Sequence, residues 1–253
     1  MENIQRCIGA VHVVLYYRCV LLSDKEVWEL NGLEGFRRVN HRLRKEKLID
    51  LARRHFPPGG RIADVGCGAG DIAMELQALG FKMTGVEFEP VRLKAASDAA
   101  KRHKLDVRFV SRDLTKWEEA GQFEGLIMGE ILEHFSQPRE ILESHLERVV
   151  PGGKILVTVP NMASLRARLK LTLFGEFADH NPEHLYYFTR RRFIEHFRDS
   201  PVEILELFTF LPEITLSSSR LLARTERLLL QPVNWLVPSC GSQLVAVLRK
   251  KTI

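Results

Sequence analysis

The sequence predicts an α/β protein built on a doubly wound, mostly parallel sheet. Strand-like and helix-like runs alternate between residues 61 and 159, and a glycine-rich turn joins the first of these strands to the first helix. With 253 residues, 45% of them hydrophobic, the chain can build one such domain with attached helices. Its formal net charge of +5 suits nucleic acid, an anionic lipid, an acidic substrate or a neutral one, so charge alone decides no function class.

The elements are expected in the following order. Residues 1–59 form a helical N-terminal extension and candidate substrate lid, in which the amphipathic helix 36–56 ends at Pro57 and Pro58. Residues 60–253 form the main domain, and its strand-like runs are 61–65, 82–87, 107–110, 123–128, 154–159, 202–210 and 242–250. Helices are expected at 71–79, 90–103, 138–149 and 190–198, together with a C-terminal Leu-rich helical insertion at about 217–237.

Two apolar segments of the sequence could contact or cross a membrane. The insertion at 217–237 has two interpretations: a helix that closes the sheet edge, or a lid over an apolar substrate or a membrane surface. Residues 7–22 are fewer than the roughly 20 apolar residues that span a bilayer and include His12 and Arg18, so we expect a packed element there rather than an anchor. The four cysteines form no CxxC pair and are expected to be reduced thiols of a cytoplasmic protein.

The turn after the first strand reads Asp64-x-Gly66-x-Gly68-x-Gly70 and is followed by Asp71. A nicotinamide-binding GxGxxG turn needs glycine where Asp71 stands, and a phosphate-binding P-loop needs a lysine and a hydroxyl residue that this turn lacks. Asp64 and Asp71 would repel a pyrophosphate at close range. The turn therefore predicts a ligand that is zwitterionic or cationic where it meets the backbone.

Two further acids follow neighbouring strands. Glu87 ends the strand 82–87, where dinucleotide-binding folds carry an acid that hydrogen-bonds a ribose diol, and Asp113 follows the strand 107–110. Because ligands of open α/β sheets bind at the carboxyl ends of the strands, we expect both acids at the ligand site. Each could instead cap a helix or carry a surface charge.

Five motifs in order carry a resemblance to a known family. They are ADVGCGAG (63–70), GVEFEP (85–90), SRDL (111–114), FEGLIMGEILEHF (123–135) and PGGKILVTVPN (151–161). Over about residues 60–200 the sequence resembles the class I S-adenosylmethionine-dependent methyltransferases, which implies a seven-stranded, Rossmann-like methyltransferase fold.

The resemblance also assigns a cofactor site for S-adenosylmethionine. It implies that the glycine turn takes the methionine part, that Glu87 binds both ribose hydroxyls, and that Asp113 with Leu114 lies at the adenine. The cofactor-binding residues implied in this way are Asp64, Gly66, Cys67, Gly68, Gly70, Glu87, Phe88, Asp113, Leu114 and Gly129.

The methyl acceptor is expected at the motif GEILEHF, in which Glu130, Glu133 and His134 stand at positions i, i+3 and i+4. If this segment is a short helix, the three side chains project from one face. They could hold a divalent ion, Mg²⁺, Mn²⁺ or Zn²⁺, or His134 could act as a base or shape the pocket without metal. The pattern is similar to that of small-molecule methyltransferases of the ubiquinone-biosynthesis type.

The segment EHLYYFTRRRF (183–193) supplies the next candidate. It looks like the segment that provides a histidine ligand in small-RNA 3′-end 2′-O-methyltransferases, and the match implies that His184 completes a four-ligand metal set with the three residues of the preceding motif. It equally resembles a pocket-capping H-x-x-x-F-T segment of lipid, glycan and quinone methyltransferases, in which Thr189 caps the following helix. The aromatic residues 186–188 could line an acceptor pocket or alternate into the core, and His180 could be a general base or a surface histidine.

The sequence as a whole predicts an S-adenosylmethionine-dependent methyltransferase that O-methylates a hydroxyl group of a small-molecule, lipid or glycan acceptor. Glu130, Glu133, His134 and His184 are the expected catalytic residues. The alternatives are metal-dependent RNA 2′-O-ribose methylation, which the short basic runs of the chain do not establish, and a non-catalytic scaffold with the cofactor fold. No transmembrane segment is expected, and peripheral membrane contact and the oligomeric state stay open.

Overall fold

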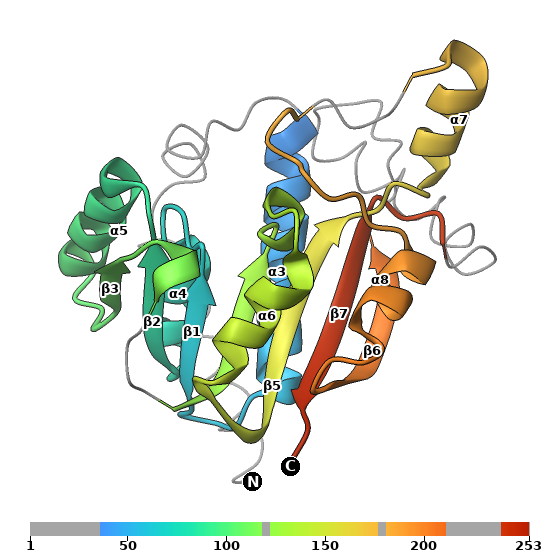
Figure 1. Cartoon of the computed structure of the whole chain (residues 1–253). Helices are drawn as coiled ribbons and strands as arrows, with labels where there is room; N and C mark the ends of the chain where they lie inside the picture. Colours follow the sequence, from blue (N-terminus) through green and yellow to red (C-terminus); the bar gives the residue numbers. More distant parts are fainter. Residues whose placement is uncertain (1–35, 118–121, 177–180, 211–238, 253) are drawn as a thin grey trace, which may run out of the picture.

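The computed structural model describes residues 36–117, 122–176, 181–210 and 239–252. Within them a seven-stranded sheet runs in the order β3-β2-β1-β4-β5-β7-β6 (Figure 1). The strands are β1 (Arg61–Val65), β2 (Lys82–Glu87), β3 (Arg108–Ser111), β4 (Phe123–Gly129), β5 (Val149–Pro160), β6 (Val202–Phe210) and β7 (Gln243–Lys250). Strands β1 to β5 pair in parallel, and β7 pairs antiparallel with both β5 and β6. The predicted seven-stranded, mostly parallel sheet is therefore confirmed.

Helices cover both faces of this sheet. They are α3 (Phe36–His55), α4 (Asp71–Ala78), α5 (Pro90–Arg102), α6 (Pro138–Leu146), α7 (Leu165–Phe174) and α8 (Arg190–Phe197), with short 3₁₀ helices η1 (Leu114–Lys116) and η2 (Leu132–His134). Successive strand residues point to opposite faces, so Ile62 and Ile127 pack with α3 and α4, whereas their neighbours Ala63 and Leu126 pack with α6 and α8.

The helix predicted at 36–56 is α3, and its two halves have different surroundings. Leu48, Leu51 and the following Phe56 are buried against the sheet, where the Phe56 ring occupies the space that a side chain at Gly125 would need. Full burial of one such side chain contributes about 1.5–3 kcal/mol. The other half of α3 is basic and reaches the carboxyl edge of the sheet. The helix thus shares the core of the main domain, and the boundary at residue 59 stays a prediction.

Helix α7 is an element that the sequence analysis does not predict. It begins after Ser164, whose hydroxyl accepts a hydrogen bond from the Ala167 amide at 3.2 Å, and ends at Gly175, whose φ is 68°. A serine N-cap and a left-handed glycine are common helix boundaries. The insertion predicted at 217–237 and the apolar run 7–22 lie outside the described residues. Within the described part of the chain, each helix is too short or too polar to cross a membrane.

Candidate active site

The turn between β1 and α4 requires glycine. Gly66, Gly68 and Gly70 have φ angles of 71°, 53° and 75°, in the left-handed region where side chains are disfavoured. The Gly66 amide donates to the Val86 carbonyl at 2.8 Å, which binds the turn to the end of β2. A side chain at Gly66 would also collide with the side chain of Ile131. Side chains of the protein therefore pack directly against this turn, Ile131 at Gly66 and Phe109 at Gly70, at the carboxyl edge of the sheet.

Three buried carboxylates surround this turn. Asp64, Asp71 and Glu87 are 2%, 6% and 8% exposed. Burial, followed by the charges of Asp71 and Glu87, raises the pKa of Asp64 to about 8, although a hydrogen bond with the Ala73 backbone lowers it. Burial, and then the same three carboxylates, raises the pKa of the Cys67 thiol, so the thiol stays protonated. A cationic ligand would relieve this repulsion, whereas a pyrophosphate would increase it.

The carboxylate of Glu87 is oriented by backbone amides. Its Oε2 accepts a hydrogen bond from Gly68 at 2.8 Å, and its Oε1 accepts bonds from Phe88 and Glu89, each at 2.9 Å. These three bonds fix the acid at the carboxyl end of β2 and tie it to the glycine turn. The Phe88 ring beside it in the chain is 67% exposed, so an apolar surface lies open at the same strand end.

Asp113, Leu114 and Gly129 lie at the ends of the neighbouring strands. The Oδ1 atom of Asp113 accepts bonds from the amide and the hydroxyl of Thr115, at 2.9 and 2.7 Å, so this acid does cap η1. Leu114 packs with Ile131 against the core below the edge. Gly129 is the last residue of β4. The structure therefore places the cofactor-binding candidates along one edge of the sheet, which is the placement that the sequence predicts for a ligand site.

The prediction that Glu130 shares a helix face with Glu133 and His134 is wrong. Glu130 lies in the turn after β4 with a φ of 57°, and η2 begins two residues later. Its Oε2 accepts a hydrogen bond from Gln243 Nε2 at 3.1 Å and lies 3.4 Å from the guanidinium of Arg44. A glutamate with positive φ is strained, and such strain clusters at functional sites. Its carboxylate connects α3 and β7 to the end of β4.

Glu133, His134 and His184 do come together. One ligand-type atom from each lies within 4.8 Å of the other two. Glu133 is 1% exposed, and both histidines are half-buried. The two imidazole rings meet edge to face with 4.9 Å between their centroids, and burial, followed by the charge of His184, lowers the pKa of His134. Three of the four expected acceptor-site residues therefore converge, and Glu130 is outside this cluster.

Backbone hydrogen bonds position His184. The amides of Leu185 and Tyr186 both donate to the Glu133 carbonyl, at 2.8 and 3.0 Å, so the segment is bound directly to η2. Nδ1 of His134 lies 3.2 Å from the Glu183 carbonyl oxygen, which joins the two parts of the cluster a second time. His180 lies outside the described residues.

The aromatic residues that follow favour the core interpretation. Phe188 is 1% exposed, and its ring lies 4.6 Å from the half-buried ring of Tyr186, while Tyr187 is 42% exposed. This alternation is typical of an extended segment with one buried face. The hydroxyl of Thr189 accepts a bond from the Arg192 amide at 3.2 Å, so the predicted cap of α8 is confirmed.

The sequence analysis misses the basic face of α3. Lys45 Nζ lies 3.7 Å from Asp71 and 3.4 Å from Glu75, and His41 Nε2 lies 3.9 Å from Asp71. His41, Arg44 and Lys45 stand at i, i+3 and i+4 in a helix that the sequence does predict, so they share one face. The periodicity of charge, rather than that of the hydrophobic residues, is the signal that could have identified them.

Comparison with known proteins places these features in a family. The family model described as "Methyltransferase domain" matches residues 36–207. The ubiquinone biosynthesis O-methyltransferase of Xanthomonas axonopodis is 29% identical over 136 residues, which cover 53% of this chain and 56% of that relative. The enzyme of the same name from Rickettsia akari is 23% identical over 187 residues, covering 71% and 74%. The chain thus spans little more than half the length of the first relative.

A solved structure has a similar fold. The magnesium protoporphyrin IX methyltransferase of Synechocystis, with bound SAH, has a TM-score of 0.63 and 13% identity, and the match covers 99% of this chain and 100% of that one. At this identity the likeness is evidence for the fold alone.

The sheet order, the glycine turn after β1 and the acid at the end of β2 agree with the Rossmann-like fold of the class I S-adenosylmethionine-dependent methyltransferases. More particularly, this chain belongs to the methyltransferase-domain family, and the matched range runs from the first residue of α3 into β6.

Proposed function

We propose that this protein transfers the methyl group of S-adenosylmethionine to a hydroxyl oxygen of a small or lipid-like acceptor. One observation carries the proposal: the glycine turn and the histidine cluster are neighbours. Ile131 occupies the space beside Gly66, and two residues later Glu133 joins His134 and His184. Holding two reactants in line supplies up to about 7–11 kcal/mol of catalysis in favourable systems. Adjacent donor and acceptor sites are what such catalysis needs.

In this proposal the cofactor lies along the carboxyl edge of the sheet. Its ribose hydroxyls donate to Glu87, whose carboxylate three amides already orient. The adenine lies between the exposed Phe88 ring and Leu114, with Asp113 at its edge. The methionine part occupies the glycine turn, where the buried acids, Asp64 among them, favour its positive charge.

The acceptor hydroxyl loses a proton as the new carbon–oxygen bond forms and the carbon–sulfur bond breaks. His134 or His184 can accept this proton. The same cluster also fits a divalent cation, because one carboxylate and two imidazoles lie close enough to share an ion. Two nitrogen donors suit Zn²⁺ or Mn²⁺ better than Mg²⁺, which prefers oxygen ligands. Such an ion, when bound, would make the acceptor hydroxyl more acidic.

The class of acceptor is inferred from the relatives. Both curated relatives named above are ubiquinone biosynthesis O-methyltransferases, which supports a ring hydroxyl on a lipid-like molecule as the acceptor here. The half-buried pair of imidazoles follows closely in the chain after Ile131, whose apolar side chain packs beside Gly66, and this combination suits such a ring.

Calorimetric titration with S-adenosylmethionine tests the cofactor site. Glu87→Ala removes the acceptor of two ribose hydrogen bonds, each worth about 1.5–3 kcal/mol, so affinity should fall roughly 100-fold or more. Glu87→Gln keeps the side-chain volume and serves as a second variant. Glu89→Ala, two residues further on and exposed, is the matched control and should bind like the parent.

The acceptor site is tested by methyl transfer to an alkyl-substituted catechol. His134→Ala should leave cofactor affinity unchanged and slow the transfer, because this imidazole contacts the acceptor and not the cofactor. Identical affinity and rate in the parent, Glu87→Ala and His134→Ala would contradict the proposal.

The two alternative functions give different results in these assays. A scaffold would bind no S-adenosylmethionine. RNA 2′-O-ribose methylation would show RNA binding that weakens steeply with salt, and a strict requirement for a divalent ion. Turnover that survives a strong chelator counts against the RNA alternative.

A further inference from the structure

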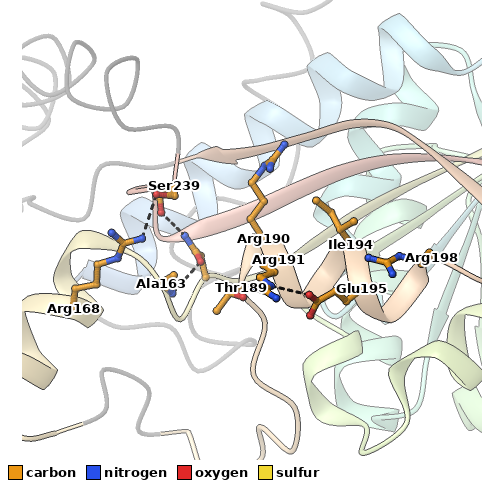
Figure 2. Close-up of a pocket in the computed structure, with 10 residues that line it drawn as sticks. Ala163, Arg168, Thr189, Arg190, Arg191, Ile194, Glu195, Arg198 and Ser239 are labelled. Atoms are coloured by element: carbon orange, nitrogen blue, oxygen red, sulfur yellow. Dashed lines mark hydrogen bonds and ion pairs between the residues drawn. The ribbon is translucent and has the colours of Figure 1, made fainter.

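A basic cavity of about 450 Å³ lies between the start of α7, the helix α8 and Ser239 (Figure 2). Among its described lining residues are four arginines and one carboxylate: Arg168, Arg190, Arg191, Arg198 and Glu195. The lining therefore carries an excess of positive charge. None of these residues belongs to the cofactor site or to the histidine cluster.

Helix α8 begins at this cavity with charges of the unfavourable sign. The N-terminus of a helix carries a partial positive charge, and acidic residues are therefore preferred in the first turn. The first turn of α8 contains no acid and reads Arg190-Arg191-Arg192. Helix α7 likewise has no acid in its first turn and carries Arg166 and Arg168 there. Anions bound between the two helix starts would offset this repulsion.

The neighbouring groups leave much of this charge uncompensated. Arg191 Nε donates to Glu195 at 2.7 Å, and Arg168 donates to the hydroxyl of Ser239 at 3.2 Å. Within the described part of the chain, Arg190 and Arg198 have no carboxylate at ion-pair distance. Figure 2 shows the four arginine side chains that line the cavity: Arg168 comes from α7, Arg190 and Arg191 from the start of α8, and Arg198 from its end.

Hydrogen bonds of Asn161 hold one wall of the cavity together. Asn161, 4% exposed, donates to the carbonyls of Ser239 at 2.9 Å and Gly241 at 2.7 Å and accepts a bond from the Ala163 amide at 3.0 Å. These bonds join the end of β5 to the start of α7 and to the segment before β7. Ala163 and Thr189, which precede α7 and α8, both line the cavity, so both helix starts are directed to one space.

We propose that this cavity binds the phosphate group of a small molecule or of a lipid headgroup. Guanidinium groups bind phosphate oxygens in pairs, and the two helix starts add backbone amides and dipoles of the same sign. The volume lies within the range of small-molecule sites and exceeds what a monatomic anion needs. His184 and Thr189 are five residues apart, so at most about 18 Å of extended chain separates the histidine cluster from the cavity. One elongated phosphorylated molecule can therefore occupy both.

Calorimetric titration of the full chain with inorganic pyrophosphate tests the proposal. We expect saturable binding at one site, weakened at least tenfold in Arg190→Gln and in Arg198→Gln. Arg53→Gln, which removes the same charge from an exposed position on α3, should bind like the parent. Without pyrophosphate, Arg190→Gln should melt no lower than the parent, because it removes a repelled charge, and it should gain less Tm when pyrophosphate is added. No binding, or equal affinity in all four proteins, would overturn the proposal.

Sedimentation with phosphatidylglycerol vesicles identifies the source of the phosphate. If the protein sediments and pyrophosphate releases it, the ligand is a lipid headgroup. If the protein stays in solution but binds pyrophosphate, the ligand is a free phosphorylated molecule. If the protein sediments with the vesicles and neither pyrophosphate nor Arg190→Gln weakens this binding, the lipid binds to another surface. That result would refute a lipid headgroup as the ligand of the cavity. These results do not depend on methyl transfer, so a failure of the proposed function leaves them intact.

Discussion

Replacing Asp64 by asparagine should change how the stability of this protein depends on pH. The pKa of Asp64 is raised to about 8 in the folded chain, chiefly by burial, against 3.8 for an ordinary aspartate. Between these values the folded state holds a proton that the unfolded chain releases. The stability that Asp64 contributes must therefore fall as pH rises from about 4 to 8 and level off above that. One proton gives a slope of about 1.4 kcal/mol per pH unit, or about 3 kcal/mol between pH 5 and 7.

Urea denaturation between about pH 5 and pH 8 measures this effect. The free energy of unfolding of Asp64→Asn, minus that of the parent, should rise by about 1.4 kcal/mol per pH unit up to about pH 7. Burial lowers the pKa of His145, so this histidine destabilises the folded protein as the pH falls below 6.5. The effect is the same in both proteins and cancels in the difference. Asp50→Asn, at a side chain 56% exposed on α3, is the control and should give a flat difference. A flat difference for Asp64→Asn would refute the reasoning.

The same proton links Asp64 to the cofactor. At pH 7 a carboxyl with a pKa of about 8 is about nine-tenths protonated. A cation at the glycine turn lowers that pKa, so binding of S-adenosylmethionine should release up to one proton into the buffer. Calorimetry in two buffers of different ionisation enthalpy detects the release, and Asp64→Asn should show none from this site.

Three further outcomes are expected. Gly66→Ala should lower the free energy of unfolding by about 2–5 kcal/mol, because the new side chain is strained at this left-handed φ and also collides with Ile131. Unchanged urea unfolding would contradict this expectation. Thr189→Ala should cost about 1 kcal/mol through loss of the α8 cap, with Thr189→Ser restoring most of it in the same assay. Titration of the chelator-treated protein with Zn²⁺ or Mn²⁺ should show one binding site, and His184→Ala should abolish it. Equal metal binding by the parent and the variant would exclude the cluster of Glu133, His134 and His184 as that site.

The sheet and the cofactor edge could be predicted because their signals are local. Apolar runs bounded by glycine and proline located every strand to within a few residues, apart from the early start of β5 at Val149. The alternate glycines and the acids that follow them indicate a ligand site through their residue types alone, without knowledge of distant contacts. Glycine adopts the positive φ angles found at 66, 68 and 70 at a much lower cost than other residues do.

The surroundings of Glu130 could not be predicted in the same way. The i, i+3, i+4 spacing is informative only if a helix begins at Glu130, whereas the chain makes a left-handed turn there. The partners of its carboxylate are Arg44 and Gln243, and the latter is 113 residues away, so no local pattern contains them. The convergence of His184 on Glu133 is also long-range, and it required a family resemblance to be suggested at all.

The position of β7 has a consequence for biosynthesis. This strand lies between β5 and β6, and among the described strands β6 pairs with β7 alone, so residues 202–210 have no strand to pair with until residues 243–250 leave the ribosome. Gln243, the first residue of β7, also supplies the amide that holds Glu130. A nascent chain therefore has an unpaired β5 edge, and its Glu130 has Arg44 but not Gln243 as a partner, until β7 is made. A stop codon before residue 243 should yield an aggregating product.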